Sequence, residues 1–173
     1  MSWKQTTWYV FHLFSLHYQP EYRDKYLTFF HSFKFILPCE VCLHHYQYHL
    51  KRDKYTLQEN INEKDIFAWT VQIHNLVSSS IQKKIWAIDE AKMHYEKLKL
   101  DSNLVKVMVL EYVKHNFKKG SQKTEELMKM LDAMRYIYPI PEKREKLIHM
   151  KLKLDRKNIK DWLLEFLYII CNE

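Results

Sequence analysis

Glycine is almost absent from this chain of 173 residues, which contains only Gly120. Loops of the GxGxxG or GxxxxGK type are therefore excluded, and a nucleotide would have to be held by side chains and helix ends. Scarce glycine also disfavours a sheet with tight turns, whereas abundant Leu, Lys, Glu, Met and aromatic residues favour helices. We therefore expect an all-α fold.

Long apolar runs are missing as well. No stretch approaches the ~18 residues of a membrane span, and the N-terminus has no apolar region of the signal-peptide kind. We expect a cytoplasmic protein without a membrane segment. Its three cysteines, Cys39, Cys42 and Cys171, do not make a disulfide framework. In a reducing compartment a lone CxxC is typical of a catalytic or metal-binding site.

The net charge of +7 comes from 28 basic and 21 acidic residues, without a block of like charge. The excess is spread over both halves of the chain, which is typical of solvated helix faces. A general attraction to anions follows, but no nucleic-acid footprint is predicted.

Hydrophobic residues recur at helical spacing along the chain. The pattern predicts helices over residues 3–18, 21–37, 39–52, 63–82 and 89–100, followed by one that Gly120 ends, one that Ser121 caps and a last one to Ile170. We expect residues 1–100 to form a four-helix bundle with a short fifth helix. Residues 101–173 are expected to form a helical extension that binds a partner or supports a dimer.

The segment Pro38-Cys39-Glu40-Val41-Cys42 begins the third predicted helix. The unpaired N–H groups and the positive dipole end of a helix start favour a thiolate. A cysteine pair at this spacing can close into a disulfide and reopen, so we expect Cys39 and Cys42 to be a redox dithiol. The thioredoxin fold is excluded, because it needs alternating strands and helices.

A second group of aromatic and basic residues lies on the fourth predicted helix and just after it. Lys83 and Lys84 could meet a pyrophosphate, and Trp86 or Tyr95 could stack on a base. His74 taken alone is more often a packed core histidine than a ligand. A nucleotide enclosed by helices is still the physically reasonable ligand for a chain without glycine loops.

Three motifs follow one another in the first hundred residues. They are Trp8-x-x-x-His12, Leu37-Pro38-Cys39-x-x-Cys42-x-x-His45-Tyr46 and Trp69-x-x-x-x-His74-Asn75-x-Val77. In this order they resemble the Erv/ALR family of FAD-linked sulfhydryl oxidases, in particular its branch from large cytoplasmic DNA viruses. The resemblance covers residues 3–97. It implies a helical bundle that encloses FAD, usually as a homodimer, and that oxidises thiols to disulfides while molecular oxygen becomes hydrogen peroxide.

The resemblance also implies roles for single residues. Cys42 would lie beside the flavin, and Cys39 would exchange with incoming thiols. Ser78 stands in the FAD site where the family usually has asparagine, and Gln5 where many members have arginine. The other positions that match the FAD site are Trp8, His12, Cys42, His45, Tyr46, His74, Asn75, Val77, Lys83, Trp86 and Tyr95.

Many cellular members carry a second, mobile cysteine pair, which this chain lacks. We therefore expect Cys39 to oxidise a thiol-containing protein substrate or relay protein directly, with residues 101–173 helping to choose it. Cys171 ends the last apolar stripe, and we expect it to be buried or inert. The viral resemblance implies a role in disulfide formation in viral proteins, in the host cytoplasm or the virion.

Two other functions remain open. Cys39, Cys42, His45 and His49 have the ligand types of a structural zinc site, although all four would crowd onto about two turns of one helix. A basic helical protein that binds nucleic acid or a virion component without catalysis is the second alternative. Flavin colour in the purified protein separates both from an oxidase.

Overall fold

The structure is a computed structural model that describes residues 2–52, 56–57, 62–118 and 121–172. In this part of the chain all regular secondary structure is helical, as the sequence predicts. None of the helices described is long and apolar enough to cross a membrane. The elements are α1 (Trp3–Leu16), the short 3₁₀ helix η1 (Pro20–Tyr22), α2 (Arg23–Ile36), α3 (Glu40–Leu50), α4 (Glu63–Ser80), α5 (Ile88–Tyr95), α6 (Ser102–Asn116), α7 (Gln122–Ile137), α8 (Pro141–Ile148) and α9 (Ile159–Cys171).

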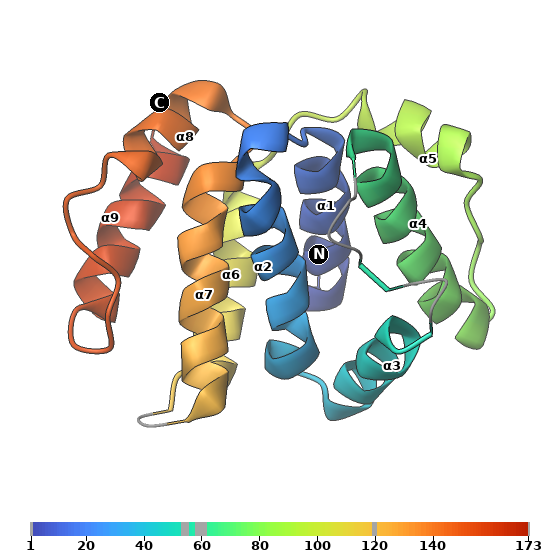
Figure 1. The fold of residues 1–173 in the computed structure, drawn as a ribbon, viewed down its shortest axis with the longest axis horizontal. Helices are drawn as coiled ribbons and strands as arrows, with labels where there is room; N and C mark the ends of the chain where they lie inside the picture. The colour runs from blue at the N-terminus through green and yellow to red at the C-terminus, as the bar shows by residue number, and fades with distance from the viewer. Residues whose placement is uncertain (1, 53–55, 58–61, 119–120, 173) are drawn as a thin grey trace.

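Helices α1 and α2 form the centre of the molecule. α1 packs against α4 and α6, and α2 packs against α3 and α7. The pair therefore lies between α3–α5 on one side and α6–α9 on the other (Figure 1). Aromatic rings at helical spacing make the central contact, because Phe11 of α1 meets three rings of α2. Its ring centroid lies 4.5 to 5.9 Å from those of Phe29, Phe30 and Phe33, in edge-to-face contacts that add to the free energy of burial.

Residues 101–173 pack onto the first hundred residues. Tyr112 of α6 is buried, with its ring centroid 5.2 Å from that of Phe33. Its hydroxyl lies 3.1 Å from the Thr7 hydroxyl on α1. One apolar cluster contains buried side chains from both parts of the chain. The core is thus continuous across residue 100, and the division of the chain there stays a prediction.

The predicted helix over 89–100 is wrong in its second half. α5 ends at Tyr95, and the chain beyond it is held by Tyr9 of α1. The Tyr9 hydroxyl donates a hydrogen bond to Lys99 O (2.8 Å) and accepts one from Asp101 N (2.8 Å). These contacts with α1 hold a turn and an irregular connection to α6 where the sequence pattern alone predicted helix.

Helix α8 was not predicted, because Leu147 is its only buried residue and it shows no apolar stripe. Arg135 of α7 holds its C-terminal end by donating to the carbonyls of Leu147 and Ile148, at 2.9 Å each. α6 ends at Asn116, and the predicted helix stop at Gly120 lies outside the described residues. The C-terminal part is therefore held together by contacts that a local pattern does not reveal.

Candidate redox and cofactor site

Cys39 and Cys42 are joined by a disulfide at the start of α3. Pro38 separates α2 from α3, and Cys39 is the N-cap of α3. Its Sγ accepts a hydrogen bond from the backbone N–H of Cys42 (3.3 Å). The sulfur therefore takes the place that serine or aspartate usually fills. Negative charge on a released thiolate is stabilised there by the helix dipole.

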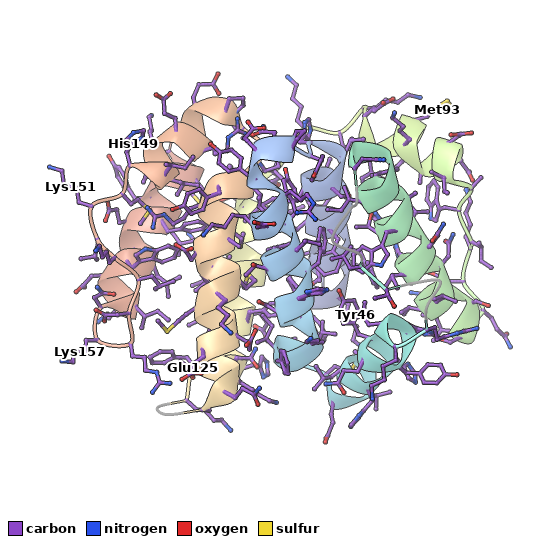
Figure 2. The ribbon with its side chains drawn as sticks, in the orientation of Figure 1. Tyr46, Met93, Glu125, His149, Lys151 and Lys157 are labelled. Carbon is purple, nitrogen blue, oxygen red and sulfur yellow. A yellow bond between two sulfur atoms is a disulfide. The ribbon has the colours of Figure 1, made fainter. Side chains whose placement is uncertain are left out.

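Helix α3 is fixed to α2 by two side chains. The buried Tyr46 donates to Phe30 O (3.0 Å), and Gln47 Nε2 donates to Lys34 O (2.6 Å). Burial raises the pKa of the Tyr46 phenol well above its usual range, so the hydroxyl stays a donor. Figure 2 shows Tyr46 where α3 meets the bundle. The position of the disulfide relative to α2 is set in this way.

Asn116 of α6 supports the chain just before the disulfide. Its buried amide donates to Ile36 O (2.7 Å) and to Tyr112 O (3.0 Å). Ile36 is the last residue of α2 and stands three positions before Cys39. The role of Asn116 could not be predicted from local sequence patterns, because its partner Ile36 lies 80 residues away. Residues 101–173 thus contact the segment that carries the redox pair.

A pocket of about 410 Å³ opens beside the disulfide. α1 forms one wall, the start of α3 a second and the end of α4 a third. The residues predicted for the cofactor site that line it are Trp8, Cys42, His45, Tyr46 and Val77. Sequence reasoning missed other lining residues, among them Trp3, Thr7 and Phe11. Their spacing at three and four positions along α1, on the face of Trp8, was the available signal.

The pocket fits an isoalloxazine ring in volume and lining. Ligand pockets usually measure about 300–1,000 Å³ and are mostly apolar. Val41 and Ile81 line this one and remain 62% and 55% exposed. Exposed apolar side chains on a concave surface are suited to an apolar ring system, and Cys42 lies in the same wall.

A second group of rings adjoins the pocket behind Trp8. Trp8 stacks on His74 of α4, with ring centroids 4.3 Å apart and planes inclined by 6°. His12 Nε2 lies 2.9 Å from His74 Nδ1, and the ring of Tyr95 on α5 lies 4.6 Å from that of His12. A small apolar cluster of Phe67, Val71 and Ala91 packs with Tyr95 and Trp86. The structure thus brings the predicted residues of α1, α4 and α5 together.

Both imidazoles of this group are neutral at pH 7. Burial lowers the pKa of His12 well below its ordinary value, and the neighbouring His74 and His94 lower it further. Burial and then the positive charge of Lys83 lower the pKa of His74 to about 4. The two histidines are therefore neutral hydrogen-bonding groups rather than cations.

Asn75 holds the segment that follows α4. Its Nδ2 donates to Trp86 O (2.8 Å), and its Oδ1 accepts from Trp86 N (3.0 Å). The turn that makes this possible passes through Gln82, whose φ of 55° is in the left-handed region. Lys83 N then donates to the carbonyl of the buried Ser78 (2.9 Å). This is a helix C-cap pattern that usually contains glycine.

The two lysines predicted to meet a pyrophosphate have different surroundings. Lys84 forms an ion pair with Glu90, and its Nζ lies 4.1 Å from the ring centroid of Trp86. Lys83 instead lies close enough to His74 to lower the pKa of that imidazole. Lys84 therefore lies against Trp86, whereas Lys83 acts on His74 through its charge.

Gln5, a position at which the family resemblance implies arginine, caps the start of α1. Its Oε1 accepts from Ser2 N (2.9 Å), while Ser2 Oγ accepts from Gln5 N (3.4 Å). This reciprocal pair is a capping box. The side chain thus satisfies the helix start, and Gln5 does not line the pocket.

The ligand set of the zinc alternative is not assembled. The residues that the structure describes contain no group of three or more His, Cys, Asp or Glu side chains that could hold a metal ion. Cys39 and Cys42, which such a site needs as thiolates, are bonded to each other.

Cys171 is exposed, so the expectation that it is buried is wrong, while the expectation that it is inert stays a prediction. It lies at the C-terminal end of α9, and α9 lies at the opposite end of the molecule from α3 (Figure 1). Cys171 therefore does not reach Cys39 within one folded chain.

Comparison with known proteins assigns the family. A model of the Erv1 / Alr family matches residues 5–97. A probable FAD-linked sulfhydryl oxidase of Acanthamoeba polyphaga mimivirus is 35% identical over 102 residues, which are 56% of this chain and 70% of the relative. The FAD-linked sulfhydryl oxidase of one African swine fever virus isolate is 32% identical over 56% of this chain and 82% of its own length. That of a second isolate is 31% identical over 68% of this chain and 93% of its own length.

No solved structure matches the chain. The family model nevertheless spans more than half of the 173 residues and includes the redox pair and the ring group. On this basis, the chain belongs to the Erv1 / Alr family.

Proposed function

We propose that this protein is an FAD-linked sulfhydryl oxidase that forms disulfide bonds in protein substrates through Cys39 and Cys42. The observation that carries the proposal is the disulfide at a helix start, in the wall of a pocket that fits an isoalloxazine ring. The names of the viral relatives support the same activity.

The protein's own sulfur atoms perform the exchange with substrate. A substrate thiolate attacks Cys39 Sγ, the Cys39–Cys42 bond breaks, and Cys42 leaves as a thiolate. The N–H groups at the start of α3 stabilise this charge. A second substrate thiolate then attacks the substrate sulfur of the mixed disulfide and releases Cys39. The substrate has lost two electrons and two protons, and Cys39 and Cys42 have become a dithiol.

Bound FAD would supply the two-electron oxidation of this dithiol, with oxygen as the final electron acceptor and hydrogen peroxide as the product. The residues of the pocket beside Cys42 would hold the isoalloxazine ring, and the ring group behind Trp8 would hold the adenosine part. Lys83 meets the pyrophosphate, because Lys84 is already paired with Glu90. Asn75 keeps Trp86 in place as a wall of the adenosine subsite.

The substrate in this proposal is a protein thiol that reaches Cys39 without a shuttle cysteine. The location of Cys171 at the end of α9, on the other side of the molecule from α3 (Figure 1), supports direct exchange. We propose that the protein acts in the host cytoplasm or virion and assembles as a homodimer. Because α6 and α7 cover α1 and α2, a second copy would associate through another face, which light scattering with surface variants can identify.

The test is oxygen consumption by the purified full chain with a small dithiol. The protein is expected to be yellow, to consume oxygen and to release peroxide. Cys42→Ser is expected to keep the flavin and to lose the activity. Cys171→Ser is the matched control, since it removes an exposed cysteine far from the pocket and should leave the rate unchanged. A colourless protein, or a fully active Cys42→Ser variant, would contradict the proposal.

A further inference from the structure

A chain of hydrogen bonds runs from Thr70 of α4 through His12 of α1 to His74. The Thr70 hydroxyl donates to Phe67 O (2.8 Å), because a carbonyl oxygen can only accept. His12 Nδ1 lies 3.1 Å from the same hydroxyl oxygen. The Thr70 hydroxyl oxygen also lies 3.1 Å from Ser15 Oγ, whose own hydrogen is donated to His12 O. Phe67 O and Ser15 Oγ can therefore only accept from Thr70. Of these three neighbours His12 Nδ1 alone can donate, which makes Thr70 Oγ1 its acceptor.

This assignment determines the hydrogen positions of both histidines. A neutral imidazole with its hydrogen on Nδ1 has an acceptor at Nε2, and His12 Nε2 lies 2.9 Å from His74 Nδ1. His74 Nδ1 must therefore carry a hydrogen, which leaves His74 Nε2 as an acceptor. In the part of the chain that the structure describes, no hydrogen bond reaches this nitrogen.

We propose that Thr70 and His12 are positioning residues that fix the tautomer of His74, so that its Nε2 offers an acceptor to a hydroxyl or amino group of the bound nucleotide. The identity of the ligand rests on the proposed function, whereas the tautomer does not depend on FAD. As an acceptor, His74 Nε2 can bind the sugar hydroxyls or the base amino group, which donate hydrogen bonds, but not the phosphate oxygens, which only accept them. The phosphates are left to Lys83, which lies near the same imidazole.

The surroundings keep the two imidazoles neutral and their rings in place. Thr70 and His12 are buried, so water does not compete for their hydrogen bond. Trp8 covers one face of His74, and the ring of Tyr95 lies 4.6 Å from that of His12. Burial, His74 and His94 lower the pKa of His12, and burial and Lys83 lower the pKa of His74. With both rings neutral, the acceptor at Thr70 determines which ring nitrogens carry hydrogen.

Nitrogen NMR of the full chain with isotope-labelled histidine reads the tautomers directly. In the wild type both His12 and His74 are expected to carry hydrogen on Nδ1, with FAD bound and after FAD has been removed. Thr70→Val keeps the shape but removes the acceptor, so the hydrogen of His12 is expected to move to Nε2 and that of His74 to move with it. His74 then presents a donor, and the affinity for FAD is expected to fall by about tenfold or more.

Two variants separate positioning from a merely structural effect. Thr70→Ser restores the hydroxyl and should restore both the tautomers and the affinity. Ser15→Ala is the matched control, since the Ser15 hydroxyl lies 3.1 Å from that of Thr70 and donates to His12 O (3.0 Å) without touching the imidazole. It should leave the tautomers unchanged.

Hydrogen on Nε2 of either histidine in the wild type would overturn the proposal. Unchanged tautomers in Thr70→Val would overturn it as well, even if FAD binding became weaker. A chain that shows the expected tautomers but binds no FAD would contradict the proposed function and support the hydrogen-bond assignment.

Discussion

Acid is expected to destabilise the flavin-free protein through His74. The pKa of this histidine is about 4 in the folded chain, against an ordinary value of 6.5. Between these values the unfolded chain binds a proton that the folded chain does not. The stability that comes from keeping His74 neutral is therefore fully present above pH 6.5 and is lost as the pH falls toward 4. From pH 7 to pH 5 the loss amounts to about 2 kcal/mol, because one pKa unit corresponds to about 1.4 kcal/mol.

Urea unfolding at pH 7 and pH 5 measures this loss. Carboxylates and other histidines titrate in the same range, and His12 adds a loss of the same sign. The comparison is therefore made with His74→Phe, which keeps a ring against Trp8 but binds no proton. The difference in unfolding free energy between the two pH values is expected to be about 2 kcal/mol smaller in the variant. An equal difference in variant and wild type would refute the argument that burial and Lys83 keep His74 neutral.

Three further substitutions test the support of the site. Asn75→Ala removes both hydrogen bonds to the Trp86 backbone, so denaturant titration should show an unfolding free energy that is lower by about 2 kcal/mol. Flavin affinity should fall as well, and an unchanged affinity would argue against Trp86 as a wall of the site. Gln82→Gly places glycine at a positive φ and should raise the unfolding free energy by up to about 1 kcal/mol, because glycine has no Cβ to clash there. An unfolding free energy below that of the wild type would show that the Gln82 side chain stabilises the turn. Asn116→Ala removes a buried donor to Ile36 O and should lower the unfolding free energy by about 1–3 kcal/mol. It should also slow dithiol oxidation at unchanged flavin content. Oxidation at the wild-type rate would contradict a role of Asn116 in holding the redox segment.

The sequence predicted the helices that bury an apolar stripe. Phe29, Phe30 and Phe33 recur at helical spacing, and their burial in α2 follows from hydrophobicity alone. α8 could not be predicted in this way, because Arg135 stabilises its end from another helix. The apolar stripes of α6 and α7 predicted that these faces are buried, but they did not predict which helices they pack against.

The same distinction between local sequence features and contacts of distant residues applies to the site. The place of Cys39 at the start of α3 follows from the neighbouring Pro38 and the cysteine spacing, which are local features. The contact between His12 and His74 joins residues 62 positions apart. Spacing puts Thr70 one turn before His74 on α4, but only the crossing of α1 and α4 brings it against His12. The resemblance named both histidines, and the fold adds the residue that orients them.

The central claim is that electrons leave Cys39 and Cys42 for a ring in the pocket beside Cys42. Rapid anaerobic mixing of the flavin-loaded protein with a small dithiol tests it directly, because a reduced flavin loses its yellow absorbance. The wild type and Cys171→Ser are expected to bleach at the same rate, and Cys42→Ser is expected to stay yellow over the same time. Bleaching of Cys42→Ser at the wild-type rate would contradict the account.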